Sequence, residues 1–154
     1  MYTIESSLRI DAYPSVDNHA VILSKQDLSS PELGWVLKID STGYVHFNDL
    51  IKSSQPLSLN TWYHIAVVNN GNSLKLSISN GPLQDEKEKH NFDNLGATCA
   101  TLRSLKTCPQ VPLLVGAQVR GGVPCSYFQG SITDVRLWYP STHLHIYTST
   151  QLVR

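Results

Sequence analysis

The chain has 154 residues with 12 basic and 12 acidic side chains, so its formal net charge is zero. This length suits one domain with a sizeable core, and the even charge argues against electrostatic capture of nucleic acid or an anionic membrane surface. No apolar run approaches the roughly 20 residues that span a bilayer, so membrane insertion is not expected. The first residues also lack the features of a secretory signal. If the protein is extracellular, we therefore expect this chain to be a processed or excised piece of a longer polypeptide.

The first part of the chain predicts short β-strands separated by turn residues. Residues 2–10 alternate between apolar and polar side chains, as in a strand with one buried face. Residues 20–24 predict a second, apolar strand. Residues 35–39 and 44–47 predict two strands joined by a loop of hairpin length, in which Gly43 supplies the positive φ that such a turn needs.

The clearest element is a β-hairpin over residues 59–81. Its first arm is aromatic or β-branched at nearly every position, which is typical of a strand covered on both faces. Its second arm, residues 73–79, alternates, and the Asn-Asn-Gly-Asn turn at 69–72 tolerates positive φ. A strand covered on both faces needs a second sheet over it, so the hairpin predicts a sandwich.

The second half of the chain is less regular. Residues 82–112 show no sustained period and predict a long irregular insertion loop. Residues 113–116 predict a strand, residues 120–124 a loop and residues 127–138 a long strand. The apolar side chains of that last strand change parity part-way, which predicts a β-bulge near residues 133–134.

Three cysteines, Cys99, Cys108 and Cys125, leave the redox compartment open. Cys99 and Cys108 bracket a short segment that a disulfide could close, which would stabilise the fold by roughly 2–3 kcal/mol. Free thiols in a reducing compartment are an equally good interpretation. Zinc is not expected, because the ligand spacing is absent from the sequence.

Strands that recur every 8–12 residues, with turn residues between them, predict an all-β fold. We expect an antiparallel two-sheet β-sandwich formed by a single domain over residues 1–154.

Six stretches resemble motifs of the laminin G-like group of the concanavalin A-like lectin/glucanase sandwiches. In chain order they are YTIE (2–5), LSK (23–25), NTWYHIAV (60–67), LSISNG (76–81), LVG (114–116) and FQGSITDVRLW (128–138). The resemblance implies a jelly-roll sandwich. It further implies a lectin-like or cell-adhesion module, extracellular or at the cell surface, as a domain of a larger protein.

Catalysis is not expected. Glucanases on this sandwich place two or three carboxylates at alternate positions of one strand, flanking the scissile bond. The sequence lacks that pattern, since Asp85, Glu86 and Glu88 lie among lysines in a loop and are best interpreted as a solvated charge run.

A sugar site combines an aromatic platform with side chains that bind hydroxyl groups. Residues of these types in or next to the expected loops are Tyr13, Trp35, Tyr44, Asn70, Asn72, Asp93, Arg120 and Tyr127. We predict these as ligand-binding residues, whereas Trp62, Trp138 and His64 are assigned to the core.

No cofactor is required, but the resemblance admits one calcium ion, because some laminin G-like domains hold calcium at the rim of the sandwich. Oxygen ligands for it are expected from Asn48, Asp49, Asn69 and Asn70. The same four residues are also ordinary turn formers.

The preferred function is therefore non-catalytic recognition of a glycan or a cell-surface protein. The first alternative is a protein-binding or structural module without glycan specificity. The second alternative is a divergent glycosidase.

Overall fold

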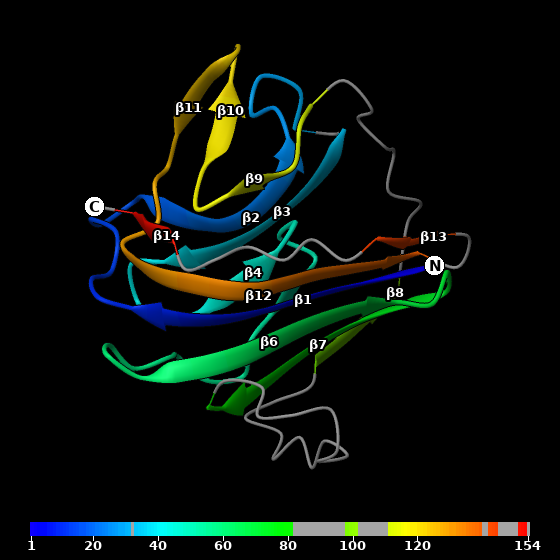
Figure 1. Cartoon of the computed structure of the whole chain (residues 1–154), viewed down its shortest axis with the longest axis horizontal. Coiled ribbons are helices and arrows are strands. Elements are labelled where there is room, and N and C mark those ends of the chain that lie inside the picture. The colour runs from blue at the N-terminus through cyan, green and yellow to red at the C-terminus, as the bar shows by residue number, and fades with distance from the viewer. Residues whose placement is uncertain (32, 82–97, 102–110, 140–141, 145–150, 154) are drawn as a thin grey trace.

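The computed structural model describes residues 1–31, 33–81, 98–101, 111–139, 142–144 and 151–153. Every regular element in these ranges is a β-strand, and two main antiparallel sheets enclose one core (Figure 1). The prediction of an antiparallel two-sheet β-sandwich is confirmed. Among the described residues, no helix has the length and apolar character to cross a bilayer.

The larger sheet has seven strands and is centred on β1. Its members are β1 (Tyr2–Ile10), β6 (Trp62–Asn69), β7 (Ser73–Asn80), β8 (Thr98–Thr101), β12 (Gly130–Tyr139), β13 (Thr142–Leu144) and β14 (Gln151–Val153). The strand order is β13-β12-β1-β6-β7-β8, and β14 also pairs with β12. The predicted hairpin is thus present as β6 and β7.

The second sheet has five strands, in the order β5-β4-β3-β2-β9. These are β2 (His19–Gln26), β3 (Gly34–Asp40), β4 (Val45–Phe47), β5 (Ile51–Lys52) and β9 (Leu114–Val115). A separate small hairpin, β10 (Gln118–Arg120) with β11 (Val123–Cys125), replaces the loop predicted for residues 120–124. The reason is that Gly121 and Gly122 both adopt positive φ, as a two-residue hairpin turn requires.

The core lies between the two sheets, where alternate residues of each strand meet. Its largest fully buried side chains include Phe47 and Phe128. The remaining core comes mainly from isoleucine, leucine and valine of β1, β2, β3, β6, β7 and β12. The alternation of apolar and polar residues in the sequence therefore identified the core faces of β1 and β7 correctly.

The predicted β-bulge in β12 is confirmed. Glu5 of β1 pairs with Arg136, whereas Ser7 pairs with Thr133, so β12 carries one extra residue between these pairs. Asp134 lies in this bulge and adopts a left-handed backbone conformation, with a φ of 52°. The bulge keeps Ile132, Val135 and Leu137 on the core side of β12.

Two tryptophans assigned to the core lie instead on the outer face of the larger sheet. Trp62 and Trp138 are half-buried, and each alternates with a core residue next to it in its strand. The Arg9 guanidinium lies 5.9 Å from the centre of the Trp62 ring. His64 is buried, as predicted, and its Nδ1 lies 3.4 Å from the Ser7 hydroxyl.

The predicted insertion loop at residues 82–112 is not irregular throughout. Strand β8 falls inside it and pairs with β7, so the larger sheet continues into this stretch. The rest of the stretch up to residue 110 lies outside the described residues.

Candidate functional site

One end of the sandwich carries a pocket of about 440 Å³, which we call the rim pocket. Two connections form it: the one between β1 and β2, and the one between β11 and β12, both at the left of Figure 1. Its lining residues are Ala12, Tyr13, Pro14, Ser15, Asn18, His19, Ala20, Ser126, Tyr127 and Gln129. The volume lies within the range of about 300–1,000 Å³ that small-molecule sites occupy.

Backbone hydrogen bonds fix the two connections to each other. The N–H of Asp11 donates to the Gln129 carbonyl at 3.0 Å, and the N–H of Val21 donates to the Ser126 carbonyl at 2.9 Å. Between these two contacts the Phe128 side chain is fully buried in the core. The pocket is therefore part of the rigid sandwich, because residues of both sheets hold it.

Two tyrosines bring aromatic surface to the rim pocket. Tyr127 is 57% exposed, and its hydroxyl donates to the Pro124 carbonyl at 3.2 Å. Tyr13 is half-buried, and its hydroxyl donates to the Leu57 carbonyl. Burial, followed by the neighbouring Tyr63 phenol, raises the pKa of Tyr13, so its ring stays a neutral phenol.

The polar part of the lining is made of neutral side chains. The Asn18 amide donates to the Ser15 hydroxyl at 2.7 Å. His19 Nε2 lies 3.3 Å from Oε1 of Gln118, a residue that is completely buried. Burial lowers the pKa of His19 below the usual range of histidine, so this imidazole is uncharged at neutral pH.

The predicted ligand-binding residues are spread over the molecule, and only Tyr13 and Tyr127 meet in the rim pocket. Trp35 was a wrong assignment: it is 6% exposed and stacks on Phe47 in the core, with ring centres 6.0 Å apart. Its strand begins at Gly34, so the indole belongs to a buried strand rather than to the preceding loop.

The other candidates lie elsewhere. Tyr44 is half-buried beside β4, with the Lys52 ammonium 3.8 Å from its ring centre. Asn70 and Asn72 belong to the β6–β7 turn, and Arg120 ends β10. Asp93 lies outside the described residues.

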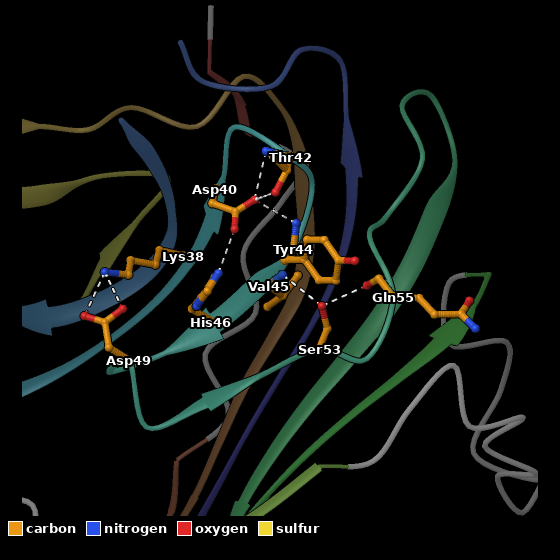
Figure 2. Close-up of polar contacts among 9 residues, drawn as sticks. All are labelled: Lys38, Asp40, Thr42, Tyr44, Val45, His46, Asp49, Ser53 and Gln55. Atoms are coloured by element: carbon orange, nitrogen blue, oxygen red, sulfur yellow. Dashed lines mark hydrogen bonds and ion pairs between the residues drawn. The ribbon is translucent and has the colours of Figure 1, made fainter. Parts of the chain in front are cut away.

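Asn48 and Asp49, two of the predicted calcium ligands, serve the smaller sheet. Asn48 Oδ1 accepts the N–H of Val36 at 2.6 Å, and its amide nitrogen donates to the Gly34 carbonyl at 3.2 Å. Asp49 forms an ion pair with Lys38 at 2.9 Å (Figure 2). Asn48 thus adds side-chain hydrogen bonds to the start of β3.

Asn69 and Asn70, the other two, stabilise the β6–β7 turn. Asn69 Oδ1 accepts the N–H of Gly71 at 2.8 Å, and Asn70 Oδ1 accepts the N–H of Ser73 at 2.7 Å. These are the side-chain-to-backbone bonds by which asparagine shapes turns. In the part of the chain that the structure describes, no group of three or more His, Cys, Asp or Glu side chains is placed to hold a metal ion.

Calcium binding stays a prediction, and a thermal-shift titration tests it. If any of the four residues binds calcium, the melting temperature of the chain rises with calcium concentration and falls back on addition of chelator, because a ligand of the folded state stabilises it. Asp49→Asn should weaken that rise. An unchanged melting temperature at millimolar calcium would contradict the prediction of calcium binding.

A second polar cluster lies on the outer face of the smaller sheet (Figure 2). Asp40 accepts hydrogen bonds from the backbone N–H groups of Thr42 and Tyr44, at 2.9 and 3.0 Å, and from the Thr42 hydroxyl at 2.7 Å. Its second oxygen lies 2.8 Å from His46 Nε2. Burial alone would raise the pKa of Asp40, but the bonds from His46, Thr42 and Tyr44 outweigh it and lower the pKa to about 2.

The Asp40 cluster predicts a specific acid sensitivity. Because the folded-state pKa lies below the unfolded value, the stabilisation is fully present above about pH 4 and is lost as the pH falls towards 2. Asp40→Asn should lower the free energy of unfolding by about 1–2 kcal/mol at pH 7, and the difference should shrink between pH 4 and pH 2. Urea titrations across this range check it, with Asp11→Asn as an exposed control. If the difference in unfolding free energy between Asp40→Asn and the wild type does not change with pH, the lowered pKa of Asp40 is contradicted.

Sequence reasoning missed Asn18, His19, Ser126 and Gln129 as members of one site. The local signals were turn residues around Tyr13 and Tyr127, which indicate loops but not which loops meet. The two loops lie together because Ile10 pairs with Gly130, a contact between strands from opposite ends of the chain.

The sequence matches no protein-family profile and no curated protein. Among solved structures it is similar to the carbohydrate-binding module CBM40 of a Ruminococcus gnavus sialidase, solved with α2,6-sialyllactose. The identity is 15%, with a TM-score of 0.45, over 84% of this chain and 71% of that one.

The chain is also similar to tailspike protein 2 of a bacteriophage of Escherichia coli O157:H7. The identity is 14% and the TM-score 0.43, over 88% of this chain but 19% of the full-length tailspike. The enzymatically active domain of tailspike protein 2 gives a TM-score of 0.37 at 15% identity, over 85% of this chain and 22% of that domain.

Proposed function

We propose that this chain is a non-catalytic carbohydrate-binding module whose ligand enters the rim pocket. The observation that carries the proposal is the pairing of two tyrosine rings, Tyr13 and Tyr127, with neutral hydrogen-bonding side chains in one pocket. A pyranose ring has an apolar C–H face that packs on an aromatic ring, and hydroxyl groups that pair with amide, hydroxyl and imidazole groups. The rim pocket offers both.

The rigidity of the pocket supports the same function. Its two connections are tied by the Asp11 and Val21 backbone hydrogen bonds, and Phe128 anchors one of them in the core. A preformed site loses little conformational entropy when a ligand binds, which matters for a sugar that gains only modest energy per contact.

The proposal does not include hydrolysis of the bound sugar. Cleavage of a glycosidic bond uses a pair of carboxyl groups on either side of it. The described side chains that line the rim pocket are aromatic, hydroxyl, amide, imidazole and aliphatic groups. We further propose that the module belongs to the laminin G-like group and works outside the cell as part of a larger protein, as its motifs imply.

A glycan-array screen of the purified chain tests the function. We expect binding to a limited set of glycans, confirmed by isothermal titration calorimetry and lost in Tyr127→Ala. If the chain shows the circular dichroism of a folded β protein but binds no glycan, the proposal is wrong and a protein partner is the better interpretation. Release of reducing sugar from a bound glycan would instead support the glycosidase alternative.

A further inference from the structure

We propose that the rim pocket selects uncharged sugars over sialylated, uronic-acid-containing or sulfated ones. This inference rests on the proposed carbohydrate-binding function and names the ligand class of the same site. Three features of the pocket support the inference: the neutral groups of its lining, the uncharged imidazole of His19, and the negative charge on the connection between β1 and β2.

The lining offers neutral hydrogen-bonding groups. Ser15 and Ser126 contribute hydroxyls, Asn18 and Gln129 contribute amides, and Tyr127 contributes an aromatic face. Hydroxyl and amide groups each donate and accept, as the hydroxyl groups of a neutral sugar also do. Proteins bind a carboxylate or sulfate group differently, chiefly through charge-assisted bonds from arginine, lysine or protonated histidine.

His19 is the described lining residue that could become a cation, and its surroundings keep it neutral. Its ring is half-buried, and this burial outweighs the contact of Nε2 with Oε1 of the fully buried Gln118, which favours the protonated ring. The charged groups that act on it are of both signs: Lys38 and Arg120 disfavour the protonated ring, whereas Asp49 favours it. A neutral imidazole hydrogen-bonds to a sugar hydroxyl but offers no charge to an anion.

The connection between β1 and β2 adds negative charge next to the rim pocket. Asp17 is exposed in this connection, in the left-handed region with a φ of 66°. Asp11 begins the connection and is paired with Arg9 at 3.1 Å, so this nearby guanidinium already has a carboxylate partner. An anionic sugar would lose hydration and be repelled by the Asp17 carboxylate, an unfavourable free energy that a neutral sugar does not incur.

Matched pairs of glycans test the inference. The wild-type chain is titrated at pH 7.5 with neutral oligosaccharides and with their sialylated and sulfated derivatives, and any glycan that binds on the array, neutral or anionic, is included with its matched partner. We expect the neutral member of each pair to bind at least tenfold more tightly. Equal or tighter binding of the anionic members would overturn the inference while leaving the carbohydrate-binding function in place. Failure of both members to bind would overturn the proposed function itself.

A gain-of-charge variant sharpens the test. Ser15→Arg adds a guanidinium at the exposed rim of the pocket, and it should shift the preference at least tenfold towards the anionic member of each pair. The matched control is Asn72→Arg, in the exposed turn between β6 and β7 at the other end of the sandwich (Figure 1). If the two variants shift the preference equally, net charge rather than the pocket sets selectivity and the inference is wrong.

Discussion

Gly130→Ala should destabilise the sandwich by about 3 kcal/mol or more. Gly130 has a φ of 152°, and a β-carbon added there would lie 2.0 Å from the Arg9 carbonyl oxygen and 2.8 Å from the Phe128 ring. The first of these atoms belongs to the backbone of β1, which is paired on both sides by β6 and β12 and cannot move away alone. The added methyl group therefore breaks the register at the start of β12.

A substitution at a second glycine distinguishes the effect of this steric clash from the effect of backbone strain alone. Gly122 has a φ of 85° in the β10–β11 turn, and an added β-carbon would meet nothing within 4 Å. Gly122→Ala should therefore cost only about 1 kcal/mol, the usual price of an alanine at positive φ. Both variants are compared with the wild type by urea denaturation. If Gly130→Ala is no less stable than Gly122→Ala, the tight contact between β1 and β12 is not real.

Tyr127→Ala should reduce glycan affinity at least tenfold, a loss of about 1.4 kcal/mol in binding free energy. The Tyr127 ring is the most exposed aromatic surface of the rim pocket, at 57%, and is thus available to stack on a sugar. Its hydroxyl is already engaged by the Pro124 carbonyl, so Tyr127→Phe should retain most of the affinity. Calorimetry with the best glycan from the array measures both effects.

Tyr44→Ala is the matched control for this experiment. Tyr44 is a partly exposed tyrosine too, but it lies beside β4 and packs under the Lys52 ammonium rather than in the rim pocket. Its removal should leave glycan affinity unchanged, while both alanine variants should keep the melting temperature close to that of the wild type. Equal loss of affinity in the two variants would show that the ligand does not sit at Tyr127.

Much of the fold could be predicted because strand patterns are local. Alternation fixed the faces of β1 and β7, and the parity change in β12 predicted the bulge that Asp134 now occupies. The β10–β11 hairpin was missed because Pro124 and two glycines read as a loop, although a two-stranded sheet tolerates proline at its edge. Trp62 was misplaced because β6 is apolar on both faces, so its sequence does not say which face meets the core.

The site could be predicted only in part, because a pocket is a long-range property. Residue types suited to sugars could be read from the sequence, and two of them, Tyr13 and Tyr127, do share the rim pocket. No local signal joins them, since they are brought together by the pairing of Ile10 with Gly130 across the chain. Asparagines suggested as calcium ligands have instead strong local roles in turns, where a single-sequence pattern cannot separate the two interpretations.

The lengths of the outermost strands bear on how copies of the domain behave when crowded together. Within the described residues, the edges of the two main sheets are β8 with four residues, β13 and β14 with three each, and β5 and β9 with two each. A neighbouring copy would meet only these short outermost strands among the described residues, whereas open-ended stacking of sheets requires long rows of unpaired backbone groups. We therefore expect the domain to tolerate dense display and high concentration without forming β-aggregates.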